Sequence, residues 1–109
     1  MGRIETKKVL QDIVEVLKEK YSPERIILFG SRAHGIPDEE SDIDLLIVKD
    51  TKESPHRRTV AVRRLISPLR TGFSVDVFVI TPDELHTRLV LGDQFLEEIH
   101  SNGEVLYAR

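Results

Sequence analysis

The 109-residue sequence contains no cysteine, which excludes disulfide bonds and cysteine-ligated zinc. It also lacks an apolar run as long as a membrane span, and its amino terminus does not pair a basic stretch with an apolar signal core. These absences predict a soluble, cytoplasmic protein. The length suits one domain, residues 1–109, which would bury about 65% of the surface that the unfolded chain exposes.

A large positive charge is missing as well. The 16 Lys and Arg residues are balanced by 19 Asp and Glu residues, and the net charge of -3 argues against a free-standing binder of nucleic-acid backbone. The charges are unevenly placed, with five acids in residues 38–44 and five arginines in residues 57–70. The first region is suited to cations and the second to an anion, although charges on an amphipathic helix usually form only its solvated side.

Hydrophobic periodicity indicates both helices and strands. Apolar residues recur at helical spacing between Val9 and Leu17, whereas the unbroken run Ile26–Phe29 is typical of a strand covered on both faces. Thr81 begins a Thr-Pro-Asp-Glu sequence, which combines an N-cap, a proline in the first helical position and the glutamate of a capping box. We expect Pro68 to end or kink the helix before it.

The predicted elements alternate along the chain. We expect helices over residues 4–20 and about 55–67 and from residues 81 and 93 onward, and strands over residues 26–29, 43–48, 73–80 and 105–107. This order predicts an α/β (α+β) fold, in which helices pack on a small mixed β-sheet of three to four strands. If the second and third strands are parallel, the helical crossover between them is right-handed.

Three aspartates stand in or beside otherwise apolar strands. Asp42 and Asp44 share one face of the second strand, with Cβ atoms about 6.5 to 7 Å apart, and Asp76 lies between two valines in the third strand. If these strands are neighbours, the three carboxylates form a cluster that neutralises its charge by binding magnesium. Such a cluster is suited to two metal ions about 3.5 to 4 Å apart, the arrangement used in phosphoryl or nucleotidyl transfer.

Each aspartate also has a purely structural explanation when it is considered alone. Asp42 would cap a loop, Asp44 would pair with an arginine, and Asp76 would have a buried, hydrogen-bonded role. Perturbed carboxylates of this kind do occur in structural ion-pair networks. The presence of all three in this pattern favours the metal site.

Gly30 and Ser31 follow directly on the first strand. A glycine there permits a tight turn and the close approach of an anion to the backbone, where N–H groups, the Ser31 hydroxyl and Arg32 would hold a polyphosphate. Taken alone, a strand that ends in Gly-Ser is usually just a turn. The segment also lacks the eight-residue phosphate-loop pattern and the glycine triad of dinucleotide folds.

These segments together resemble a known family. Leu28–Ala33, a gap of ten residues between Ser31 and Asp42, and then Ser41–Leu46 are similar to the signature of the polymerase-beta nucleotidyltransferase superfamily, in particular its small prokaryotic minimal nucleotidyltransferases. Val75–Val77 matches the third acidic strand of that family, and Gly103–Tyr107 resembles a common family ending. The resemblance covers nearly the whole chain and implies a polymerase-beta-like nucleotidyltransferase fold.

The resemblance also implies roles for the site residues. Asp42 and Asp44 would ligate two Mg²⁺ ions, while Asp76 would complete the second site and help activate the acceptor hydroxyl. Gly30 and Ser31, with Arg32, would bind the β and γ phosphates of a nucleoside triphosphate, expected to be ATP. The hydroxyl would attack the α-phosphate, and pyrophosphate would leave. His34 stands where family members often have a second arginine, which predicts weaker phosphate binding.

In the minimal family the partner that supplies the acceptor surface is commonly another protein. The resemblance implies a small helical HEPN-type ribonuclease toxin as the partner, with this chain as the antitoxin that adenylylates a toxin tyrosine. One alternative is a binding module that neutralises its partner by covering it, without catalysis. A second is a homodimer that adenylylates a small molecule of the aminoglycoside type. The nucleotide base, the acceptor and the oligomeric state are left open by the sequence.

Overall fold

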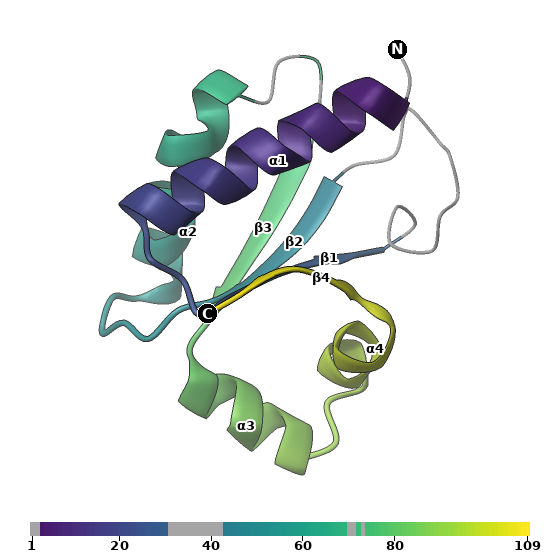
Figure 1. Cartoon of the computed structure of the whole chain (residues 1–109). Helices are drawn as coiled ribbons and strands as arrows, with labels where there is room; N and C mark the ends of the chain where they lie inside the picture. Colours follow the sequence, from purple (N-terminus) through teal and green to yellow (C-terminus); the bar gives the residue numbers. More distant parts are fainter. Residues whose placement is uncertain (1–2, 31–42, 70–71, 73) are drawn as a thin grey trace.

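Helices pack on both faces of one four-stranded mixed sheet (Figure 1). The computed structural model describes residues 3–30, 43–69, 72 and 74–109. In chain order, the elements of these residues are α1 (Arg3–Lys20), β1 (Arg25–Phe29), β2 (Ile43–Val48), α2 (Pro55–Ile66), the 3-10 turn η2 (Ser67–Leu69), β3 (Val75–Ile80), α3 (Pro82–Val90), α4 (Gln94–Asn102) and β4 (Glu104–Ala108). No helix in this described part is long and apolar enough to cross a membrane.

The strand order is β3-β2-β1-β4. β1 is antiparallel to both β2 and β4, whereas β2 and β3 are parallel and are connected through α2. The predicted mixed sheet is therefore confirmed. Because β1 runs opposite to β2 and β3, the end of β1 meets the beginnings of the two acidic strands at one end of the sheet.

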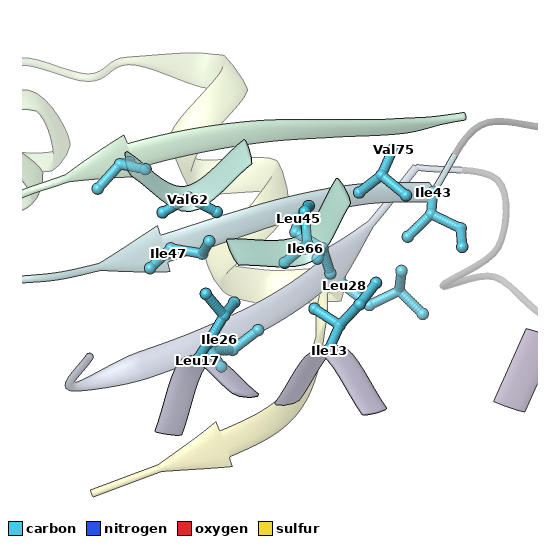
Figure 2. Close-up of a cluster of buried hydrophobic side chains, with 11 residues drawn as sticks. Ile13, Leu17, Ile26, Leu28, Ile43, Leu45, Ile47, Val62, Ile66 and Val75 are labelled. Atoms are coloured by element: carbon cyan, nitrogen blue, oxygen red, sulfur yellow. The ribbon is translucent and has the colours of Figure 1, made fainter. Parts of the chain in front are cut away.

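One face of the sheet is covered by α1 and α2, which lie together on the same side in Figure 1. Side chains from alternate strand positions pack there against both helices, as Figure 2 shows. The buried members of this first cluster are Ile13, Leu17, Ile26, Leu28, Ile43, Leu45, Ile47, Val62, Ile66, Val75 and Val79. The alternation follows from the two-residue repeat of a strand, which directs every second side chain to the same face.

The other face is covered by α3 and α4 (Figure 1). The buried members of this second cluster are Ile27, Leu46, Val48, Ile80, Leu85, Leu96 and Ile99. Asp44 lies two residues before Leu46, and Asp76 lies four residues before Ile80. Both aspartates therefore belong to the face of the sheet that carries α3 and α4.

The predicted helix boundaries are largely confirmed. Thr81 caps α3, and both hydrogen bonds of its capping box with Glu84 are present. Asp93 caps α4 by accepting a hydrogen bond from the backbone N–H of Leu96. The chain leaves α2 after Ile66 and continues as the 3-10 turn that contains Pro68, whose missing N–H prevents the regular helix from continuing. β3 begins at Val75, and Phe73 lies outside the described residues.

Arg58 departs from the prediction that the arginines of residues 57–70 form a solvated helix face. Its side chain is only 6% exposed and donates from Nη1 and Nη2 to the carboxylate of Glu84, at 2.7 and 3.2 Å. Its Nε donates to the carbonyl of Glu53 at 2.8 Å. The helical pattern of α2 could not indicate this burial, because the partner carboxylate comes from the capping box of α3.

The ion pair connects α2 with α3, which lie on opposite faces of the sheet. The hydrogen bond from Arg58, and then the hydrogen bond from the backbone N–H of Thr81, lower the pKa of Glu84 from 4.5 to about 2. The same hydrogen bond raises the pKa of Arg58 above its ordinary value. Both groups are therefore charged over the whole neutral range, and the pair holds the two helix layers together.

Substitution of Glu84 tests this connection. We expect Glu84→Gln to lower the free energy of unfolding by about 1–2 kcal/mol near neutral pH, because the buried guanidinium of Arg58 loses its counter-charge while the capping acceptor is kept. The pKa of Glu84 is lower in the folded chain than in the unfolded chain. Its stabilisation is therefore complete above pH 4.5 and is lost as the pH falls through about 2.

Urea unfolding at about pH 7 and about pH 3 measures both effects. The stability difference between the native chain and Glu84→Gln should be smaller at the lower pH. Since 42% of the Glu84 side chain is exposed, solvent screens part of the interaction and keeps the difference below the full pKa shift. Glu15→Gln on the exposed side of α1 is the control. A difference independent of pH would contradict the assignment.

Candidate functional site

The end of the sheet where β1 finishes and β2 and β3 begin gathers three of the predicted site residues. Asp44 is the register partner of Phe29 on one side and of Asp76 on the other. Gly30 follows Phe29 directly. The predicted neighbourhood of Asp44 and Asp76 is confirmed, because the two aspartates are adjacent across parallel strands and share a face.

Gly30 and the Asp44 carboxylate are in close contact. Gly30 has a φ of 80°, which L-residues with a side chain rarely adopt. A Cβ atom built on Gly30 would lie 2.5 Å from Asp44 Oδ2, so the carboxylate occupies the space that any other residue would fill. The sequence predicted that Gly30 lets the backbone approach a phosphate. The structure adds a second requirement for glycine at this position, because the absence of a side chain makes room for the acid of the neighbouring strand.

Asp76 lies on the edge strand β3 and is open to solvent. Its side chain is 60% exposed, and its Oδ1 lies 3.8 Å from Arg63 Nη2 of α2. The alternative explanation, a buried and hydrogen-bonded structural role for Asp76, is therefore wrong. An exposed ion pair of this length contributes about 0.2–1 kcal/mol, which leaves the carboxylate available to a stronger ligand.

Sequence reasoning did not single out Arg63 from the other arginines of residues 57–70. The helical pattern of α2 does not separate Arg63 from the other arginines, because its position beside Asp76 arises only when α2 packs along β3. Arg63 places positive charge at the edge of the site. It balances the Asp76 carboxylate in the folded chain.

Carboxylate oxygens from Asp44 and Asp76 are the type of donor that Mg²⁺ prefers. They project from adjacent strands, whose backbones lie about 4.8 Å apart, onto the same face. The residues fit a divalent cation in donor type and in placement. Within the described ranges, no group of three or more potential metal-binding side chains is gathered. Asp42, Ser31 and Arg32 lie outside these ranges, so their roles stay predictions.

A pocket of about 250 Å³ opens on the β4 side of Gly30. It is lined by Phe29, Gly30, Phe95, Glu98, Ile99, Asn102 and Gly103. Gly103 joins α4 to β4 so closely that a Cβ atom there would lie 2.5 Å from the carbonyl oxygen of Ile99 and 2.6 Å from Ile27 Cγ2. Gly103, the C-cap of α4, therefore also closes one wall of this pocket.

Comparisons with known proteins agree with this arrangement. A family model described as "Polymerase beta, Nucleotidyltransferase" matches residues 11–109. A "putative protein adenylyltransferase" of Methanocaldococcus jannaschii is 52% identical over 102 residues, covering 92% of this chain and 96% of that protein. A second protein of the same description and organism is 32% identical over 97 residues, covering 89% of this chain and 90% of its own length.

One solved structure has the same fold. It is a "putative nucleotidyltransferase" from Sulfolobus solfataricus, with a TM-score of 0.67 and 23% sequence identity. The alignment covers 100% of this chain and 91% of that chain. The agreement in fold extends over the entire described sheet and its helices.

Proposed function

Since this chain belongs to the polymerase-beta nucleotidyltransferase family, we propose that it transfers the adenylyl group of ATP to a hydroxyl group of a protein partner. The observation that carries the proposal is the adjacency of Asp44 and Asp76 on one face of the sheet, beside the backbone of Gly30. The relatives in Methanocaldococcus jannaschii support a protein as the acceptor, because their descriptions name protein adenylylation.

The residues of the chain have separate roles in the proposed reaction. Asp44 and Asp76, with the predicted ligand Asp42, would hold Mg²⁺, which supplies the positive charge that a triphosphate requires. Gly30 has no side chain of its own between its backbone and a phosphate oxygen, and it lines the open pocket at the end of β1. Ser31 and Arg32 remain the predicted partners of the β and γ phosphates.

Asp76 is the group to which an acceptor has access. Its exposure on the edge strand lets an incoming hydroxyl reach the carboxylate, which accepts the hydroxyl proton. The oxygen then bonds to the α-phosphorus as the bond to the bridging oxygen of pyrophosphate breaks. AMP is joined to the acceptor, and pyrophosphate leaves with the displaced electron pair.

The partner in this proposal is a HEPN-type toxin, and the chain acts as its antitoxin. The support is the resemblance to minimal nucleotidyltransferases together with the protein acceptors named for the relatives. An enzyme that modifies a toxin tyrosine removes its activity by a covalent change. A binding module would achieve protection without any such change.

Label transfer tests the proposal directly. The chain is incubated with Mg²⁺, ATP labelled at the α-phosphate and the candidate toxin, and the toxin is then separated by electrophoresis. We expect label on the toxin, and mass spectrometry should find an added AMP on a hydroxyl side chain. ATP labelled at the γ-phosphate is the control and should give no labelled protein. A toxin that stays unlabelled under both conditions would contradict protein adenylylation.

A further inference from the structure

The pocket beside Gly30 has a composition that the acidic site does not explain. Phe95, Glu98, Ile99 and Asn102 of α4 are spaced at i, i+3, i+4 and i+7, so they form one face of the helix. Ile99 is buried and closes the floor against the sheet. The face thus presents one aromatic ring, one carboxylate and one amide around an apolar base.

Phe95 is exposed yet held in a fixed orientation. Its relative solvent exposure is 50%. Its ring makes edge-to-face contacts with Phe29, at a centroid distance of 5.6 Å and an angle of 85°, and with Phe78, at 6.0 Å and 76°. An aromatic ring that two others hold in place offers its free surface for stacking at little further entropic cost.

The polar side chains of the pocket can form hydrogen bonds with the edge of a purine base. An asparagine amide can bind adenine through two hydrogen bonds, accepting from the exocyclic amino group and donating to N7. The carboxylate of Glu98 accepts only, which suits the exocyclic amino group of adenine. The wall therefore offers hydrogen-bond partners for the amino edge of adenine.

The position of the pocket indicates which part of the substrate would bind in it. The acceptor approaches Asp76 on β3, and Gly30 separates the acidic site from the pocket on the side of β4. A volume of about 250 Å³ suits one heterocyclic ring system, since pockets for drug-sized ligands range from about 300 to 1,000 Å³.

We propose that this pocket binds the adenine base of ATP, with Phe95 stacked on the ring and with Asn102 and Glu98 hydrogen-bonded to its edge. The inference rests on the proposed function, because it requires a nucleoside triphosphate at the acidic site. It adds the part of the chain that holds the base. The phosphates then extend from the pocket past Gly30 toward Asp44.

Calorimetric binding of two probes in the presence of Mg²⁺ tests the pocket. The probes are the α,β-methylene analogue of ATP, which cannot release pyrophosphate, and inorganic tripolyphosphate, which has no base. We expect Phe95→Ala to weaken binding of the ATP analogue by about 5-fold to 150-fold and to leave tripolyphosphate binding unchanged. Phe95→Trp should keep the affinity of the native chain. Glu98→Gln should also weaken binding of the ATP analogue, because an amide oxygen accepts a weaker hydrogen bond than a carboxylate, and should leave tripolyphosphate binding unchanged.

Leu91→Ala is the matched control, because Leu91 is an apolar residue with 79% exposure that lies outside the pocket. It should bind both probes as the native chain does. Phe95→Leu keeps apolar packing against Phe29 and Phe78 without an aromatic ring. It replaces Phe95→Ala if thermal unfolding shows that the alanine variant does not fold.

The possible outcomes separate this inference from the proposed function. If the native chain binds neither probe, nucleotidyl transfer itself is wrong. If the native chain binds both probes and the Phe95 variants bind the ATP analogue equally well, the pocket does not hold the base, although the proposed function stands. If the Phe95 variants bind the ATP analogue as the native chain does but transfer less label to the partner, the pocket binds the acceptor. That result also overturns the inference.

Discussion

Replacement of Asp44 by asparagine should lower the rate of adenylyl transfer by at least about 100-fold. The substitution keeps the shape of the side chain but removes the negative charge that a divalent cation requires, and loss even of groups that only support metal ligands typically costs about 10-fold to 100-fold. The initial rate of label transfer to the partner, measured at saturating ATP and Mg²⁺, gives the size of the effect. Thermal unfolding verifies that the variant is folded.

Asp50→Asn is the matched control for this substitution. Asp50 is exposed and lies just beyond the opposite end of β2, so it has the same chemistry at a place remote from Gly30 and Asp76. This variant should transfer label at the native rate. Transfer by Asp44→Asn at the native rate would contradict a catalytic role for the acidic site.

The same substitution distinguishes catalysis from masking of the partner. If adenylylation neutralises the toxin, cells that produce the toxin are protected by the native chain and by Asp50→Asn, but not by Asp44→Asn. If the chain acts only by covering its partner, all three protect equally, provided that they accumulate to the same level. Growth of cells under induced toxin expression is the measurement.

Replacement of Gly30 by alanine should be nearly as damaging to activity. The new methyl group would lie 2.5 Å from Asp44 Oδ2, so the carboxylate must move away from its place beside the backbone. Displacement of a catalytic group by about 1 Å can lower a rate by about 100-fold. We therefore expect a loss of roughly that size in label transfer, together with weaker Mg²⁺ binding in a titration calorimeter.

Gly92→Ala provides a close control, because Gly92 has a φ of 81° and a Cβ atom there meets no heavy atom within 4 Å. A left-handed backbone at an alanine should lower the free energy of unfolding of both variants by about 1 kcal/mol or somewhat more. Only Gly30→Ala disturbs a carboxylate. The two should lose similar stability in urea, whereas Gly92→Ala should keep its activity. Equal activity of the two variants would show that the contact with Asp44 is unimportant.

The local elements and half of the candidate site were predictable from the sequence because their signals are local. Strand runs such as Ile43–Val48 and the capping box at Thr81 depend on neighbouring residues, and the structure confirms them. Asp44 and Asp76 stood out as acids in apolar strands, and their adjacency required only that β2 and β3 be neighbours. Asp42, Ser31 and Arg32 lie outside the described residues, so their roles stay predictions.

Three features could not be predicted, because each joins residues that are distant in sequence. Arg58 is buried against Glu84, 26 residues away, although both belong to patterns that usually face solvent or cap a helix. Arg63 lies beside Asp76 only because α2 packs along β3. The contact of Gly30 with Asp44 depends on the antiparallel register of β1 and β2.

The sequence by itself determined which residue types are present, approximately where the helices and strands lie, and which residues share a strand face with the acids, since these follow from local propensity and periodicity. Only the tertiary structure decided which charges meet, why Gly30 has no room for a side chain, and that α4 and the end of β1 form a pocket beside it. The physical reason is that side-chain pairing across strands and helices is set by packing and register, which no local pattern of the chain records.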